Sequence, residues 1–233
     1  MSFEAPLPPY NASDPSASFL NSSCLDLLMI ELVPMTWRVV REVDGVNASL
    51  GTAVDGKAGG GGSGSVNGGS TAGTAGGGGT VEGEGLKGEE EEQEERDAAF
   101  YRLEMLGYRV GQGLVERFSK DRPRFTDTLD VIKFLCKDLW MLVFRKQIDN
   151  LKTNHRGVYV LTDNSFRPFS RMSTEAGGQA VVRAQPFLWF PCGIIRGALA
   201  SMGINATVQA ETSELPGATF QIKSITVTGA GKA

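Results

Sequence analysis

The chain has 233 residues, with 23 basic and 27 acidic side chains and a pI near 5.2. The acidity is local, because residues 45–97 hold 10 acidic and 3 basic residues together with 18 of the 30 glycines. Without that stretch the net charge becomes +3 instead of −4, which excludes a strongly acidic protein and gives no broad basic surface for nucleic acid. The remaining residues, about 180, suffice for one domain with a sizeable core.

The first predicted helix covers about residues 18–41. Asp14-Pro15 supplies a start signal, and large apolar side chains are dense from Phe19 to Val33. Pro34 lacks the amide hydrogen that would bond the carbonyl of Ile30, so we expect a kink or an early stop there.

Residues 45–97 are predicted to be a disordered insertion, because a Gly/Ser/Thr/Ala segment cannot bury enough apolar area to offset its chain entropy. The domain then comprises residues 18–44 and 98–228, between a disordered N-terminus (1–17) and a flexible tail (229–233). The acidic run 89–95 suits a helix N-terminus and can extend the next helix backwards. A solvated charge run is favoured over an acidic docking motif.

Two further helices follow the insertion. The second helix places Leu103, Leu106, Val110, Leu114 and Phe118 at spacings of three and four, and Arg122-Pro123 ends it. The third begins at the cap pair Thr126-Asp127 and is expected to continue to about Leu151. Its apolar residues cover more than one stripe, which predicts a central helix covered on two sides.

The last third of the chain predicts short strands around one helix. A turn at 153–157 leads into a strand at 158–162, and Pro186 and Gly203 bracket a fourth helix. Alternating residues predict strands at 206–211 and 219–227, the second with a possible bulge near Ser224. This order of elements predicts an α+β domain with an antiparallel sheet.

Residues suited to catalysis are few, so we predict a protein that is not an enzyme and holds no cofactor or metal. His155 is the only histidine, and it lies in a turn rich in polar residues. A zinc site would need several closely spaced Cys or His ligands. Gly111-Gln-Gly113 begins like a dinucleotide fingerprint, but Glu116 stands where the third glycine belongs. The chain start resembles no signal peptide, no segment resembles a membrane span, and three distant cysteines suit a reducing compartment, so we expect a cytosolic protein.

Small residues at spacing four form a second pattern. Gly107 and Gly111 fall on the second helix, and Gly193 and Gly197 fall on the fourth. Glycine in a helix costs about 1 kcal/mol relative to alanine, so the repetition indicates close backbone packing. Packing inside the domain is favoured, and contact with a partner subunit is the alternative.

Four long sequence segments resemble the small core subunits of the TRAPP vesicle-tethering complex. Among these subunits they are most similar to subunit 6, the 33-kDa member in yeast naming. They are residues 103–117 (LEMLGYRVGQGLVER), 129–140 (LDVIKFLCKDLW), 146–166 (KQIDNLKTNHRGVYVLTDNSF) and 190–199 (FPCGIIRGAL). The resemblance covers about 150 residues, 18–41 and 98–226.

The resemblance implies four helices packed on one side of a twisted four-stranded antiparallel sheet. It implies a non-catalytic scaffold subunit that pairs with another small core subunit through its first two helices and meets larger peripheral subunits. The assembled complex would be a guanine nucleotide exchange factor for Rab GTPases in ER–Golgi and Golgi transport, with peripheral membrane association through the complex.

The side chains expected at the partner interface lie on the first two helices: Leu27, Leu28, Glu31, Leu103, Val110 and Leu114. The alternative is a module that binds a lipid or small molecule in its apolar helical interior. Cys136, Cys192 and Trp189 would line that cavity, and Cys136 would be the site of any fatty acylation.

Overall fold

The computed structural model describes residues 21, 23–55, 82–120, 122–154, 156–172 and 179–225. The chain divides into two compact units, residues 1–34 with 100–233 and residues 35–99. The second unit holds the later part of helix α1 (Ser23–Asp55) and the beginning of helix α2 (Glu82–Phe118). Within it, Arg41 Nε lies 3.2 Å from Glu95 Oε2. The predicted N-terminal and C-terminal disorder falls outside the described residues.

Helix α1 passes through Pro34 without ending, so of the two expected outcomes, a kink or an early stop, the early stop is wrong. A row of side chains at helical spacing is buried on one face: Met29, Leu32, Val33, Thr36 and Val40. Burial of this row on both sides of the proline outweighs the loss of one backbone hydrogen bond.

The helices also correct the predicted disorder of residues 45–97. Helix α1 continues to Asp55 and α2 already begins at Glu82, so only residues 56–81 of the insertion fall outside the described residues. The glutamate run extends α2 backwards as the acidic pattern indicated, because glutamate is a good helix former and propagation from a packed helix is inexpensive.

The third predicted helix is shorter and less regular than expected. It comprises α3 (Thr128–Phe134), a π-helical turn (Leu135–Leu139) and α4 (Trp140–Phe144). Its predicted start is confirmed, since the carboxylate of Asp127 accepts a 2.8 Å hydrogen bond from the amide of Asp130. It ends seven residues before Leu151, because Arg145 adopts a left-handed conformation with φ 62°.

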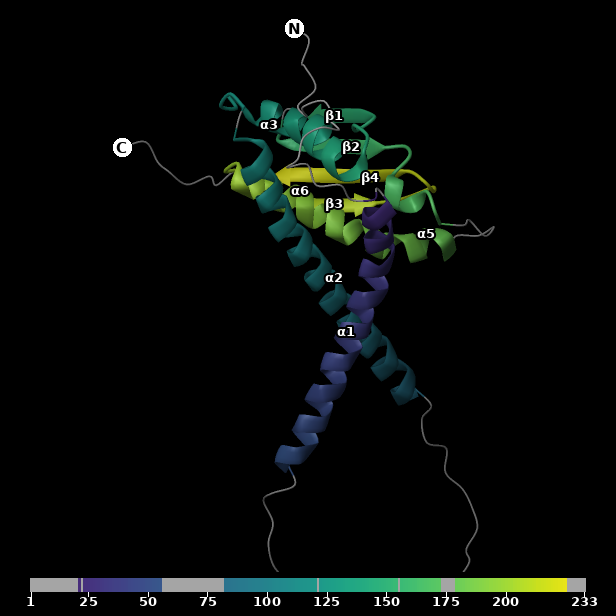
Figure 1. Cartoon of the computed structure of the whole chain (residues 1–233). Coiled ribbons are helices and arrows are strands. Elements are labelled where there is room, and N and C mark those ends of the chain that lie inside the picture. Colours follow the sequence, from purple (N-terminus) through teal and green to yellow (C-terminus); the bar gives the residue numbers. More distant parts are fainter. Residues whose placement is uncertain are drawn as a thin grey trace, which may run out of the picture. The chain divides into compact units, whose positions relative to one another are not determined.

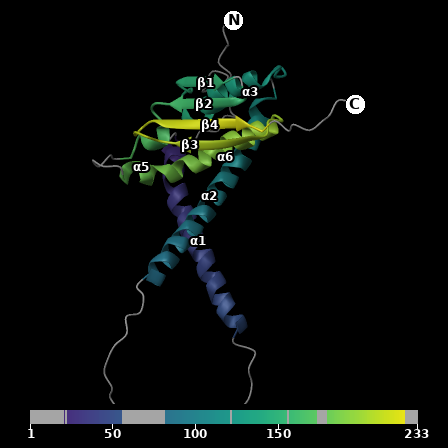
Figure 2. The same cartoon turned by 180° about the vertical axis from the view of Figure 1, so that it is seen from behind.

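The four strands form one antiparallel sheet in the order β1-β2-β4-β3, comprising β1 (Asn150–Asn154), β2 (Val158–Asp163), β3 (Ala206–Glu211) and β4 (Ala218–Ser224). Burial alternates along β2, so one face is covered. Figure 1 shows α3 and α6 (Trp189–Ser201) in front of the strands, and Figure 2 shows the strands on the opposite side. The predicted α+β class is confirmed.

An aromatic cluster fills the space between the sheet and the helices. Trp140, Phe166 and Phe220 are fully buried, and the rings of Trp140 and Phe220 meet edge to face at 5.2 Å. Trp140 Nε1 donates a 2.9 Å hydrogen bond to Asp163, which also accepts a 2.6 Å bond from Lys146 Nζ. Asp163 has no exposed surface, so these two donors satisfy a carboxylate that would otherwise be costly to bury.

Short helical pieces precede α6. They are a 3₁₀ turn (Arg167–Phe169), α5 (Gln179–Ala184) and a second 3₁₀ turn (Gln185–Leu188). Pro186 stands in that second turn, and Gly203 has φ 80° just after α6, so the predicted brackets of the fourth helix are confirmed to within a few residues.

Candidate partner interface

Helices α2 and α6 meet backbone to backbone through four glycines. A side-chain carbon added to Gly107 would collide with the carbonyl oxygen of Phe190, and one added to Gly111 would collide with that of Ile194. The contact is reciprocal: Gly193 and Gly197 face the carbonyl oxygens of Glu104 and Tyr108. The spacing-four pattern therefore serves packing inside the domain, as the favoured interpretation held.

Charged groups lock the same crossing. Arg196 donates hydrogen bonds from Nε and Nη2 to the two carboxylate oxygens of Glu104. Glu104 is only 8% exposed. The guanidinium also lies 4.6 Å from the ring centroid of Tyr108. The hydrogen bonds to the carboxylate of Glu104 raise the pKa of Arg196. Sequence reasoning missed this pair, since its partners stand 92 residues apart.

The beginning of α1 is fastened by a second ion pair. Arg167 donates from Nε and Nη2 to the two carboxylate oxygens of Asp26, at 2.8 and 3.0 Å. This hydrogen bonding from Arg167 lowers the pKa of Asp26. The inner side of the helix buries Met29 and Leu32. One side of this first part of α1 is thus committed to the domain, which leaves its other side available.

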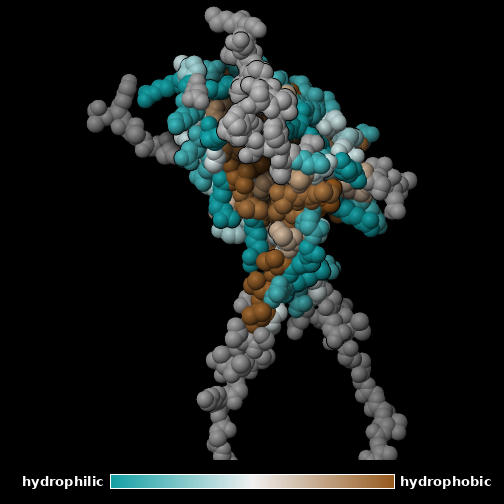
Figure 3. Space-filling view, in the orientation of Figure 1, coloured by the Kyte–Doolittle hydropathy of each residue, from teal (hydrophilic) through white to brown (hydrophobic). Residues whose placement is uncertain are grey.

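The outer side of α1 carries apolar side chains that the domain does not cover. Leu27 is 63% exposed, Leu28 is 57% exposed and Ile30 is 41% exposed. Figure 3 shows apolar surface following this helix. Several exposed large apolar side chains within one helical turn are unusual for a solvated face and typical of an association surface.

The other predicted interface residues differ in their accessibility. Glu31 is exposed, Val110 is 38% exposed and Leu114 is half-buried. Leu103 is completely buried in the domain core, so it cannot meet a partner directly and leaves the interface set. The spacing of apolar residues along α2 did not distinguish the face of this helix that packs inward from the face that remains accessible.

Residues considered for chemistry are either buried or outside the described part. Burial raises the pKa of the Cys136 thiol to about 12 and raises that of Cys192 even further, so neither is a thiolate at neutral pH. His155 lies outside the described residues. Across those residues, His, Cys, Asp and Glu form no group of three suited to a metal ion, and no helix is long and apolar enough to cross a membrane.

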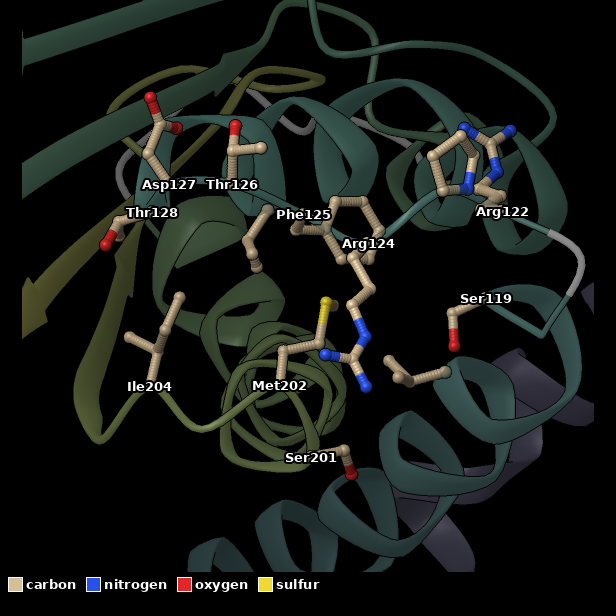
Figure 4. A pocket seen from close by; sticks show the side chains of 13 residues that line it. Ser119, Arg122, Arg124, Phe125, Thr126, Asp127, Thr128, Ser201, Met202 and Ile204 are labelled. Atoms are coloured by element: carbon tan, nitrogen blue, oxygen red, sulfur yellow. The ribbon is translucent and has the colours of Figure 1, made fainter.

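A cleft of about 510 Å³ opens where α2 ends, beside α3 and the end of α6. Its apolar wall includes Val115, Val131 and Ile204. Figure 4 shows Arg124 reaching from the loop before α3 toward Met202. The residues expected to line a lipid cavity, Cys136, Cys192 and Trp189, do not line it, so the cleft gives no support to that alternative.

Comparison with known proteins gives consistent matches. A sequence model described as transport protein particle (TRAPP) component matches residues 25–225. Trafficking protein particle complex subunit 6b of Danio rerio is 56% identical over 121 residues, covering 52% of this chain and 76% of that protein. Subunit 6B of Homo sapiens is 52% identical over 136 residues (58% and 85% coverage), and human subunit 6A is 50% identical over 120 residues (52% and 74%).

Among solved structures, trafficking protein particle complex subunit 3 from Naegleria fowleri, covalently bound to palmitic acid, aligns with a TM-score of 0.47 and 16% identity. The alignment covers 60% of this chain and 91% of that chain.

Fold and surface together define an α+β domain with a helical layer on one sheet face, buried thiols and an uncovered apolar helix side. The match over residues 25–225 makes the class specific. The chain belongs to the transport protein particle (TRAPP) component family, and its relatives in subunit 6 share about half of the aligned residues.

Proposed function

We propose that the chain is a non-catalytic scaffold subunit of a TRAPP complex, in which it pairs with another small core subunit. The observation that carries the proposal is the uncovered apolar side of α1, where Leu27 and Leu28 are both more than half exposed. The names of the relatives support the kind of assembly, since each is a subunit of the trafficking protein particle complex.

The pairing surface comprises the outer side of the beginning of α1 and the accessible part of α2. Leu27, Leu28 and Glu31 come from α1, and Val110 and Leu114 come from α2. Burying an exposed leucine contributes roughly 1.5–3 kcal/mol, so a few such side chains provide substantial affinity. Hot-spot residues of this kind dominate protein interfaces.

Within the assembled complex, the chain would stabilise its partner and help to hold larger peripheral subunits. The complex as a whole would act as a Rab guanine nucleotide exchange factor in ER–Golgi and Golgi vesicle transport, with the exchange surface on other subunits. The chain would reach those membranes from the cytoplasm, peripherally and through the complex.

Light scattering of the chain co-expressed with a small core subunit tests the proposal. We expect a 1:1 heterodimer that is lost in a double variant, Leu28→Asp with Val110→Asp, because each aspartate would be buried without a partner. Val182→Asp is the control for charge on an exposed valine, since Val182 is 63% exposed on α5 and belongs to neither helix of the proposed surface. Unchanged pairing in the double variant, with native circular dichroism, would contradict the proposed surface.

A further inference from the structure

The cleft at the end of α2 contains a cation, Arg124, that has no ion-pair partner among the residues that the structure describes. Arg122 is engaged, because its guanidinium donates a 2.7 Å hydrogen bond to Asp138 and stacks on Phe134. Arg124 is exposed and forms no ion pair within the part of the chain that the structure describes. Its side chain extends across the cleft, as Figure 4 shows.

The acidic groups at the cleft are already used by the protein. Asp127 caps α3 by accepting from the amide of Asp130, and Thr126 donates a 2.7 Å hydrogen bond to the carboxylate of Asp130. The rest of the lining combines an apolar wall with hydroxyls such as Ser119 and Ser201. Among the described residues, the cleft thus offers apolar contacts and a positive charge without an ion-pair partner, which suits a segment carrying a carboxylate beside large apolar side chains.

Residues 1–20 have this composition. They contain Glu4 and Asp14 but no lysine, arginine or histidine, and large apolar side chains flank Glu4 at Phe3 and Leu7. The other segments outside the described residues do not combine these features. Residues 56–81 and 226–233 contain no acid, and residues 173–178 contain no large apolar side chain.

The segment that joins Glu4 to the described domain is long enough to reach the cleft. Glu4 precedes Asn21, the start of the described chain, by 17 residues, which span up to about 56–61 Å when extended. A domain of about 170 residues has a radius of gyration of about 15 Å, so this segment can reach any part of its surface. A flexible tether of this kind gives an effective concentration on the order of millimolar, so weak complementarity suffices for occupancy.

We propose that residues 3–10 of this same chain occupy the cleft, with the carboxylate of Glu4 paired to the guanidinium of Arg124 and Phe3 or Leu7 against the apolar wall. Three prolines in this segment, Pro6, Pro8 and Pro9, restrict its unbound conformations and lower the entropy lost on docking. The cleft is a site for an internal ligand, and its lining shares no residue with the pairing surface on α1 and α2.

Equilibrium disulfide formation in the full chain tests the proposal. Ala5→Cys is combined with Ser119→Cys, in the cleft, or with Gln209→Cys, on the exposed sheet face, as the control; Cys24→Ser removes the exposed native thiol in both. The disulfide fraction in a glutathione buffer, measured by mass spectrometry, reports the effective concentration of each pair. We expect the cleft pair to exceed the control pair about tenfold.

Charge reversal then identifies the contact. Arg124→Glu or Glu4→Arg alone should lower the excess of the cleft pair about threefold or more, and the double reversal should restore it. Equal disulfide fractions in both pairs, or no rescue by the double reversal, would overturn the proposal. If Arg124→Glu instead weakens assembly with another chain and leaves the cleft disulfide unchanged, the occupant is an acidic segment of that chain, and the proposal is wrong. Pairing through α1 is measured separately and can stand or fail by itself.

Discussion

The glycine crossing of α2 and α6 makes a quantitative prediction for Gly193→Ala. An added methyl group at this position would lie on the carbonyl oxygen of Glu104 and only 2.8 Å from the amide nitrogen of Tyr108. Both are backbone atoms of a helix, so no side chain can turn away to make room. The two helices must separate along the whole crossing, which loosens the packing at the other glycines as well.

Two opposing terms decide the size of the effect. Replacing a helical glycine by alanine stabilises the helix by about 1 kcal/mol. Overpacking costs typically 1–3 kcal/mol, and a clash with backbone belongs at the upper end of that range. We therefore expect a net loss of about 2 kcal/mol in the free energy of unfolding. For a domain of this size the melting temperature would fall by about 4–8 °C.

Urea unfolding followed by tryptophan fluorescence measures the loss, with Gly113→Ala as the matched control. Gly113 lies on the same helix α2, and an added methyl group there meets no atom within 4 Å. The control should gain up to about 1 kcal/mol from helix propensity alone. If Gly193→Ala were as stable as Gly113→Ala, the close approach of the helices would not exist and the reasoning would be refuted.

Three further predictions concern the ion pairs and thiols. Asp163→Ala should lower the free energy of unfolding by about 3 kcal/mol, since it leaves the buried donor of Trp140 unsatisfied; urea unfolding should show partial recovery in Asp163→Asn. Asp26→Asn should destabilise the chain at pH 6 but progressively less below about pH 4. The pKa of Asp26 is lower in the folded state, so its contribution exists above the unfolded value and disappears as the pH falls through the folded one. A thiol reagent at pH 7.5 should label only Cys24 in the native chain, with the two buried cysteines reacting after unfolding, as counted by intact mass.

Local signals in the sequence predicted those parts of the fold that local chemistry determines. The cap at Asp127, the strand from Ala206 to Glu211 and the tight glycine packing were all confirmed, because each depends on a side chain type at a fixed spacing. The first strand, Asn150–Asn154, was not predicted, because its beginning was assigned to the end of the third helix and its last residues to the turn at 153–157. Leu151 is its only apolar residue, and the left-handed Arg145 that ends the helix carries no glycine or proline signal.

The candidate interface was predictable only in part, for a related reason. Helical periodicity placed Leu103 and Val110 on one apolar helix, but it could not show that the domain itself buries the first and leaves the second accessible. Which apolar side is covered depends on contacts between distant segments, such as the pair of Glu104 with Arg196. The cleft around Arg124 gave no sequence signal, since its wall comes from three separate helices and a loop.

The four interlocked glycines also restrict how α2 can move. Sliding this helix along α6 would move each glycine away from the carbonyl oxygen that it faces and would disrupt this close fit, so translation at the crossing is opposed. Shear between packed helices is a common way for domains to change shape, and the close fit of the glycines disfavours it here. We therefore expect α2 to respond to a bound partner by tilting about the glycine crossing and not by sliding along α6.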